Sequence, residues 1–132
     1  MSSDVEELIN ELSFEDGLIS AIVQDAETDK VLMLAYMNKK AFKKTIKEKM
    51  GYFYSRSREK LWKKGETSGN VQKVKEIYID CDGDAILVKV DQENGACHTG
   101  HESCFYRRLI DNSFRKVEDR VFDPEDVYGE DK

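Results

Sequence analysis

Hydrophobic residues recur along this chain at two spacings, and the first of them is helical. Near the N-terminus, Ser3 and Glu6 have the spacing of a capping box, a reciprocal hydrogen-bonding pair found at helix starts. The apolar residues in this region recur at i, i+3, i+4 and i+7: Val5, Leu8, Ile9 and Leu12. Because this spacing places side chains on one helical face, the sequence predicts a short N-terminal helix.

After Gly17 the pattern changes to that of strands. Apolar runs alternate with short polar segments containing Gly, Asp or Asn, as strands alternate with turns. Asp82-Gly83, a dipeptide favoured in tight hairpin turns, separates two of the runs. These two runs, and the first two of the chain, are expected to form hairpins. The predicted strands are residues 18–24, 31–37, 52–57, 71–81, 84–90 and 105–110.

A second helix is predicted after Asn38, which is a favoured N-cap residue. Its apolar stripe consists of Ala41, Phe42, Thr45 and Ile46. Gly51 lies where helices commonly end in a left-handed residue. The polar residues 58–70 form a loop that is long enough to be suspected of a function.

The length of 132 residues fits one compact domain. With 39% hydrophobic and 36% charged residues, the chain should fold and carry a heavily charged surface. We expect an α+β fold, a strand-rich single domain over residues 1–132 with a mostly antiparallel sheet and one or two short helices. The core should span about residues 17–110, and the acidic tail, residues 118–132, is expected to be partly disordered.

The chain has neither the basic start nor the long apolar segment of a secretory signal. Its longest uninterrupted apolar run, residues 31–37, is much shorter than the roughly 20 residues that span a bilayer. Three cysteines in such a chain are expected to be reduced. We therefore expect a cytoplasmic protein with no membrane partner, whose thiols are available for metal binding or catalysis.

The net charge of -6 conceals a basic segment. Residues 39–64 contain nine Lys and two Arg against two Glu, a local charge of about +9, so the rest of the chain carries about -15. An acidic protein with one concentrated basic segment is poorly suited to coating nucleic acid. It can, however, present a positive field to a phosphorylated small molecule.

The cysteines Cys81, Cys97 and Cys104 are the most informative residues. Thiolates select zinc and similar soft metals. Catalytic zinc sites typically have three protein ligands and one open position for water, and these cysteines, which include no Cys-x2-Cys pair, fit that arrangement better than a closed structural site. Spacing alone leaves an equal alternative, three unrelated buried thiols.

Asp80, Asp82 and Asp84 surround Cys81, and their carboxylates suit a hard cation such as magnesium. Side chains two apart share one side of a strand, so Asp80 and Asp82 would serve a different metal from Cys81 unless the turn twists them together. A calcium loop of the EF-hand type is excluded, because its sixth position, glycine in such loops, is Ala85 here. The alternative is that the aspartates only decorate a turn.

His98 directly follows Cys97, where it could relay a proton beside a metal-bound water. An unperturbed histidine pKa of about 6.5 suits that role near neutrality. A structural histidine is the alternative reading, and it is the favoured one for His101.

The loop after the third strand has the ingredients of a phosphate cradle: ammonium groups, hydroxyls and glycine amides. Neighbouring arginines could add bidentate contacts and an indole could stack on a base, although a solvated turn has the same composition. The residues expected to bind substrate are Arg56, Arg58, Trp62, Lys64, Thr67, Ser68 and Gly69.

Four segments in this order closely resemble the phosphoribosyl-AMP cyclohydrolase family of histidine biosynthesis. They are Tyr54-Ser-Arg-Ser-Arg58, Leu61-Trp-Lys-Lys-Gly-Glu-Thr-Ser-Gly-Asn70, Asp80-Cys-Asp-Gly-Asp84 and Cys97-His-Thr-Gly-His-Glu-Ser-Cys-Phe105. The resemblance covers about residues 17–108. Four ordered motifs are much harder to match by chance than one.

The resemblance implies a stand-alone enzyme that forms an intertwined homodimer, with zinc ligands drawn from two chains. Too few residues follow Arg108 for the pyrophosphohydrolase domain that some relatives carry. The implied metal ligands are Cys81, Cys97 and Cys104 for zinc, and Asp80, Asp82 and Asp84 for magnesium.

The implied substrate is 1-(5-phosphoribosyl)-AMP, whose N1 substituent makes C6 of the adenine electrophilic. A zinc ion lowers the pKa of its water from about 15.7 toward about 7, so hydroxide is available to attack C6. We expect His98 to accept or relay the proton, the N1–C6 bond to open, and magnesium to bridge a phosphate.

Two other functions compete with this interpretation. A zinc-stabilised RNA-binding module could stack bases on aromatic residues beside basic ones, namely Tyr52, Phe53, Tyr54, Arg56, Arg58 and Trp62. A zinc nucleoside deaminase would need a Cys-x2-Cys pair and a His-x-Glu motif. The first would bind single-stranded RNA without turnover, and the chain lacks the Cys-x2-Cys of the second.

Overall fold

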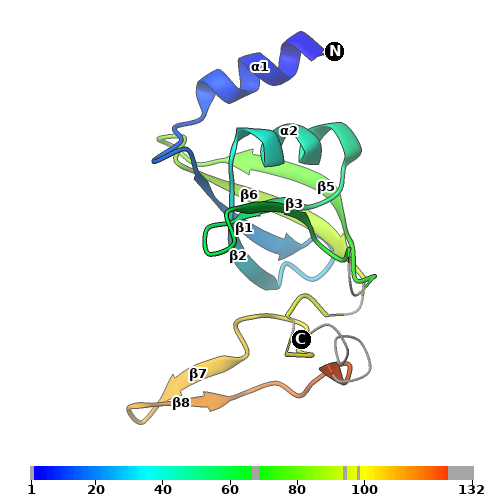
Figure 1. Cartoon of the computed structure of the whole chain (residues 1–132). Helices are drawn as coiled ribbons and strands as arrows, with labels where there is room; N and C mark the ends of the chain where they lie inside the picture. The colour runs from blue at the N-terminus through cyan, green and yellow to red at the C-terminus, as the bar shows by residue number, and fades with distance from the viewer. Residues whose placement is uncertain (1, 67–68, 94, 98, 125–132) are drawn as a thin grey trace.

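The computed structural model describes residues 2–66, 69–93, 95–97 and 99–124 of the chain. Neither helix in these segments is long and apolar enough to cross a membrane. The helices are α1 (Ser2–Glu11) and α2 (Lys39–Glu48), and the strands are β1 (Ile19–Asp25), β2 (Val31–Met37), β3 (Tyr52–Ser55), β4 (Lys60–Lys63), β5 (Gln72–Ile79), β6 (Ala85–Gln92), β7 (Arg107–Ile110) and β8 (Ser113–Lys116) (Figure 1).

The central sheet has the strand order β2-β1-β6-β5. Both expected hairpins are confirmed, since β1 pairs antiparallel with β2 and β5 pairs antiparallel with β6. β1 and β6 run parallel, which joins the two hairpins into one sheet. The other strands form the antiparallel ladders β3–β4 and β7–β8. The α+β class and the mostly antiparallel pairing are therefore confirmed, with one parallel pair.

One face of the two central strands forms the core. Its alternating buried side chains are Ile19, Ala21, Val23, Ile86, Val88 and Val90. α2 and β3 contribute Phe42 and Phe53 to the same cluster, and α1 adds Ile9 (Figure 1). Because burying one large apolar side chain contributes about 1.5–3 kcal/mol, this layer holds the helices on the sheet.

The opposite face of the sheet presents a row of apolar side chains. The strand register places Ile22 beside both Leu34 and Leu87, and Leu87 beside Tyr78. Leu34 and Tyr78 at the two ends are 46% and 50% exposed. An apolar surface that crosses a whole sheet is commonly a contact with another protein.

The end of α2 differs from the prediction. The Asn38 side chain accepts a hydrogen bond from the N–H of Ala41 at 2.8 Å, which confirms the N-cap. The left-handed residue after the helix is Lys49, with φ of 57°, and not Gly51. A Cβ on Gly51 would lie 2.6 Å from Oε1 of Gln72. This glycine therefore allows the chain to pass close to β5 and does not end the helix.

β4 is a strand where the sequence pattern predicts loop, and β8 is a strand in a segment for which the sequence pattern predicts no element. Each completes a short antiparallel hairpin with the strand before it. The hairpin of β7 and β8 projects away from the sheet (Figure 1). Its cross-strand neighbours Leu109 and Phe114 are 58% and 71% exposed, so this arm carries apolar surface at its outer end.

The first part of the acidic tail is ordered against the body of the protein. The Glu118 carboxylate lies 2.7 Å from the Lys30 ammonium. The N–H of Val121 donates to the carbonyl oxygen of Gly100 at 2.7 Å. Residues 118–124 thus contact the rest of the protein, and residues 125–132 lie outside the described part of the chain, so partial disorder of the tail stays a prediction.

Candidate active site

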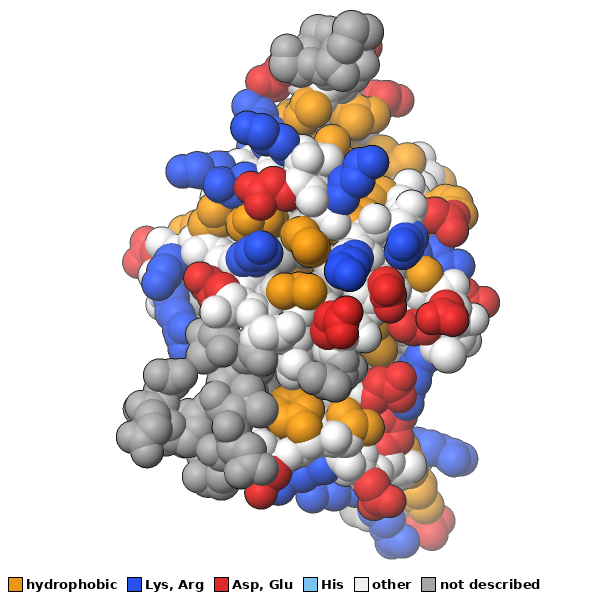
Figure 2. Space-filling view, turned by 90° about the vertical axis from the view of Figure 1, so that its right-hand side faces the viewer, with side chains coloured by type: hydrophobic (Ala, Val, Ile, Leu, Met, Phe, Trp, Pro, Cys, Tyr) orange, Lys and Arg blue, Asp and Glu red, His pale blue; other side chains and the backbone are white. Residues whose placement is uncertain are grey.

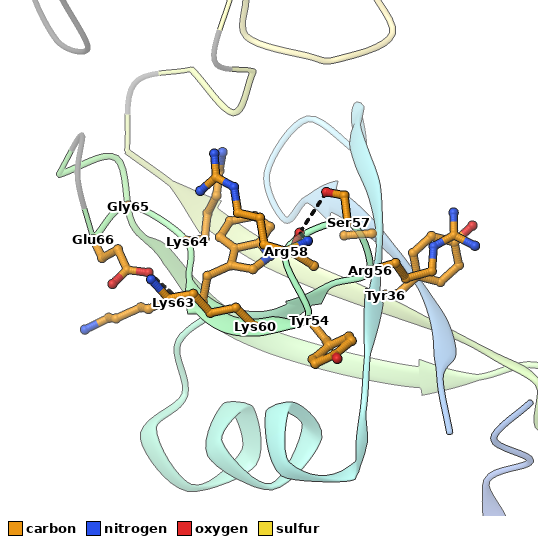
Figure 3. Close-up of a pocket in the computed structure, with 13 residues that line it drawn as sticks. Tyr36, Tyr54, Arg56, Ser57, Arg58, Lys60, Lys63, Lys64, Gly65 and Glu66 are labelled. Carbon is orange, nitrogen blue, oxygen red and sulfur yellow. Dashed lines mark hydrogen bonds between the residues drawn. The ribbon is translucent and has the colours of Figure 1, made fainter. Parts of the chain in front are cut away.

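A cavity of about 1100 Å³ opens along the β3–β4 hairpin, with β2 on its far side (Figure 3). Its lining includes four of the residues expected to bind substrate: Arg56, Arg58, Trp62 and Lys64. Of the other three, Gly69 is not among the lining residues, and Thr67 and Ser68 lie outside the described residues.

The basic segment of the sequence folds as α2, β3 and β4, and the part of it from Arg56 to Lys64 supplies the cations that line this cavity. Figure 2 shows Lys and Arg side chains spread over the upper part of one face, with acidic side chains more frequent below them. Among the described lining residues, Glu66 is the only acid beside five cations. The cavity therefore attracts anions such as phosphate groups.

The β3–β4 hairpin orients the aromatic and arginine side chains. Trp62 is the register partner of Phe53, and their ring centroids are 5.2 Å apart. Arg56 places its guanidinium 4.2 Å from the ring centroid of Tyr36, away from Lys63 and Lys64 (Figure 3). The indole is thus held in the cavity wall, while Arg56 is already engaged with an aromatic ring from β2.

Lys64 is buried, with 8% of its surface exposed. Its N–H donates to the carbonyl oxygen of Gly51 at 2.8 Å, and its ammonium donates to the carbonyl oxygen of Ala96. Burial lowers the pKa of this ammonium, and the neighbouring sulfurs of Cys104 and Cys97 oppose that effect. Lys64 thus connects the cavity wall to the loop that carries Cys97.

Cys97 and Cys104 lie together at the end of the sheet where β6 finishes. Cys97 is buried, and its Sγ accepts a hydrogen bond of 3.0 Å from Oγ1 of Thr99. The N–H of Cys104 donates to the carbonyl oxygen of Leu32 at 2.7 Å. A hydrogen bond to Cys97 and desolvation raise the pKa of the Cys104 thiol. Two neighbouring sulfurs are a donor pair that suits a soft cation such as zinc.

Asp80, Asp82 and Asp84 gather at the turn between β5 and β6. Their carboxylate oxygens all lie within 4.8 Å of one another, the only such group of three potential ligands in the described residues. Hydrogen bonds and repulsion from Asp80 and Asp82 raise the pKa of Asp84 to about 6. A divalent hard cation would relieve that repulsion, so the donor set fits magnesium.

Cys81 lies in this turn, far from the other two cysteines. The turn lies beside the start of β1 and β6. The carbonyl oxygen of Gly83 in this turn accepts a hydrogen bond of 2.7 Å from the N–H of Ser13, which precedes β1. The Cys97 and Cys104 pair lies at the opposite end of β6, because Cys104 bonds Leu32 near the start of β2, which adjoins the ends of β1 and β6. The described part of one chain therefore does not bring the three thiols together.

The structure describes only one of the two histidines that the sequence analysis considered. His98, the expected proton relay, lies outside the described residues. His101 is 2% exposed, its ring stacks on Tyr106 with centroids 3.6 Å apart, and Nδ1 is 2.8 Å from the hydroxyl of Thr99. These contacts support the structural reading of His101.

Two further residues of this region were not recognised as site residues from the sequence. Tyr36 lines the cavity from β2 and has no local signal, because only the fold brings it there. Asn70 is 3% exposed and its side-chain amide donates to the carbonyl oxygen of Gly95 at 3.5 Å. A polar residue that ends a glycine-containing loop is the signal that could have identified Asn70.

Comparison with known proteins identifies the family of this chain. The sequence profile of the phosphoribosyl-AMP cyclohydrolase family matches residues 33–106. A phosphoribosyl-AMP cyclohydrolase from Chlorobaculum tepidum is 56% identical over 86% of this chain and 84% of its own length. Another from Methanosarcina mazei is 57% identical over 89% of this chain and 95% of its own. The chain therefore belongs to the phosphoribosyl-AMP cyclohydrolase family and is a hydrolase.

Proposed function

We propose that this chain hydrolyses 1-(5-phosphoribosyl)-AMP in histidine biosynthesis, opening the adenine ring at the N1–C6 bond. The observation that carries the proposal is the sulfur pair of Cys97 and Cys104 next to a basic, aromatic-lined cavity. Lys64 belongs to both, since it lines the cavity and bonds the residue before Cys97.

The chemistry follows from the substituent on N1. A ribosyl group at this position disturbs the aromatic electron count and makes C6 electrophilic. The oxygen of water bonds to C6 and becomes the carboxamide oxygen, and the C6–N1 bond breaks. Of the two protons that the water loses, one ends on N1 and the other on the exocyclic nitrogen of C6, which leaves a carboxamide and a formimino group. Bound zinc would supply a water whose pKa is lowered from about 15.7 toward about 7. We assign His98 the role of accepting the proton.

The cavity residues would bind and orient the substrate. Arg58 can bind a phosphate group through two parallel N–H donors. The indole of Trp62, braced by Phe53, offers a face for the purine. We retain as further proposed contacts Arg56, Lys64, Thr67, Ser68 and Gly69.

We propose that zinc is held by Cys97 and Cys104 of one chain and Cys81 of a second copy. The reason is that Cys81 and the sulfur pair lie at opposite ends of β6. A two-fold axis perpendicular to β6 would place the two copies antiparallel, so that the end of one copy that carries Cys81 meets the end of the other that carries the sulfur pair. The apolar row on the sheet and the exposed arm of β7 and β8 supply surface for this homodimer.

The second metal would be magnesium on Asp80, Asp82 and Asp84, which neighbour Cys81 in the same turn. Magnesium usually keeps several waters and is bound by few carboxylates together with substrate phosphates. In the proposed homodimer, the aspartates of one copy would therefore face the cavity of the other and take part in phosphate binding.

The test is to supply purified protein with 1-(5-phosphoribosyl)-AMP and follow ring opening by ultraviolet absorbance. Chelation should abolish turnover and zinc should restore it. Cys97→Ser should lower kcat by about 100-fold or more while circular dichroism shows a folded chain. Full activity in protein shown to be metal-free would refute the zinc mechanism. Salt-sensitive binding of single-stranded RNA without any turnover would instead favour an RNA-binding module.

A further inference from the structure

Lys64 is unusual among the lysines of the cavity because its ammonium is buried. Lys63, its neighbour in sequence, is half-buried, with Nζ 5.9 Å from the ring centroid of Tyr52. The Lys64 ammonium lies 5.9 Å from the ring centroid of Trp62 and, unlike that of Lys63, also donates to the carbonyl oxygen of Ala96. No carboxylate among the described residues forms a salt bridge with it. Buried charges are normally paired, so this one calls for a partner.

The partners that the fold provides are two sulfurs. Ala96 directly precedes Cys97, so the Lys64 ammonium binds the backbone at the residue before a thiol. Cys97 and Cys104 are also the two ionisable groups whose charges act favourably on Lys64. The buried ammonium therefore lies beside the sulfur pair that the proposed zinc site would use.

A second contact holds the same loop. At the other end of the loop that begins with Lys64, the side-chain amide of Asn70 donates to the carbonyl oxygen of Gly95. Gly65 has φ of +90°, and a Cβ there would lie 2.6 Å from the backbone nitrogen of Val71. The loop is thus folded tightly back on itself, and its two ends bind consecutive carbonyls just before Cys97.

We propose that Lys64 is a positioning residue for the metal ligands: its buried ammonium fixes the backbone that carries Cys97 and places a positive charge beside the Cys97 and Cys104 sulfurs. This inference rests on the proposed zinc site. Three thiolates and one Zn²⁺ carry a net charge of about -1, which a neighbouring ammonium offsets. Lys64 would then serve the metal from the cavity side, in addition to its proposed contact with the substrate.

The test compares Lys64→Met, which keeps the length and removes the charge, with Lys63→Met as the matched control. Zinc affinity is measured by competition with a chromogenic chelator, and Co²⁺ substitution reports thiolate ligation through its charge-transfer absorption. Loss of a group that supports metal ligands typically weakens metal binding by about 10–100-fold. We expect a loss in that range for Lys64→Met and a change of less than about threefold for Lys63→Met.

Two further variants of Lys64 test whether its charge or its packing supports zinc binding. Lys64→Arg should recover most of the zinc affinity, whereas Lys64→Gln should resemble Lys64→Met. Equal affinity in wild-type protein and both neutral variants would overturn the inference. So would neutral variants that fail to fold with or without zinc, because the lysine would then serve the fold and not the metal.

Wild-type protein and Cys97→Ser are measured in parallel. If wild-type protein shows no thiolate charge-transfer band with Co²⁺, the proposed metal site itself fails, and the inference about Lys64 falls with it. If wild-type protein shows the band, Cys97→Ser loses it and Lys64→Met keeps it at full affinity, only the role of Lys64 is refuted.

Discussion

The separation of the three cysteines leads to a test with variants that are inactive alone. Cys81 lies where β6 begins, and the Cys97 and Cys104 pair lies where it ends. β6 has 8 residues, which at about 3.3 Å each separate its ends by about 26 Å. Two sulfurs on one zinc ion are only about 4 Å apart, because each Zn–S bond is about 2.3 Å. One chain would have to shift the turn by roughly 20 Å to build the site alone.

We therefore expect Cys81→Ser and Cys97→Ser to complement each other. A two-fold dimer has two equivalent sites. In a heterodimer of these variants, one site has lost both cysteines and the other has lost neither. Co-expression with two affinity tags and tandem purification isolates this heterodimer. It should bind about one zinc ion and turn over at about half the wild-type rate per dimer.

The pairing of Cys97→Ser with Cys104→Ser is the matched control. Both replacements fall on the same half of a shared site, so each site of this heterodimer contains one defect and no activity should return. Activity in this control, or a Cys81→Ser and Cys97→Ser heterodimer as inactive as its parents, would show that the ligands are not divided between two chains.

Three further predictions concern the metal-free fold and the cavity. Asp80 and Asp82 raise the pKa of Asp84 from 3.8 to about 6, so the folded state binds the Asp84 proton more tightly than the unfolded state does. The protonated Asp84 carboxyl therefore stabilises the fold fully below about pH 4, and this stabilisation is lost as the pH rises through about 6. Asp84→Asn should thus raise the Tm of metal-free protein above about pH 6 and have little effect near pH 4; a Tm gain independent of pH would contradict this. Gly65→Ala should lower the free energy of unfolding, measured in urea, by about 2 kcal/mol or more. Gly69→Ala should lower it by only about 1 kcal/mol, because a Cβ at Gly69 would meet no atom within 4 Å. Equal losses in the two variants would refute the steric argument. Trp62→Ala should lower kcat/KM by about 10–100-fold, mainly through KM, with Trp62→Phe recovering most of it; an unchanged KM would exclude stacking on the base.

The sequence predicts the elements with strong periodic or turn signals. The N-terminal helix, the two hairpins of the central sheet and the Asn38 cap all depend on neighbours in sequence, and all are present. β4 and β8 could not be recognised from the sequence. Each has only four residues and is a strand only because it pairs with the preceding strand. The parallel pairing of β1 with β6 joins residues about 65 positions apart, such as Ser20 and Ala85, and has no local signal.

The candidate site shows the same division between local and long-range information. The aspartates converge at one turn, as their spacing allowed, since a short connection limits how far they can separate. The cysteines are spread over more of the chain, and spacing could not reveal that Cys81 lies at the other end of the sheet. Burial of the Lys64 ammonium was equally hidden, because a lysine beside glycine and hydroxyl residues has the composition of an exposed phosphate-binding loop.

Cys81 lies at one end of the sheet, and Cys97 and Cys104 lie at the other. This separation predicts how the enzyme behaves in dilute solution. A newly synthesised chain would hold two half-sites and no complete one, so it would acquire chemistry only on meeting another copy. Specific activity should then fall with dilution below the dissociation constant of the pair. Metal occupancy would fall with it, and zinc content would become a direct measure of how much of the protein is assembled.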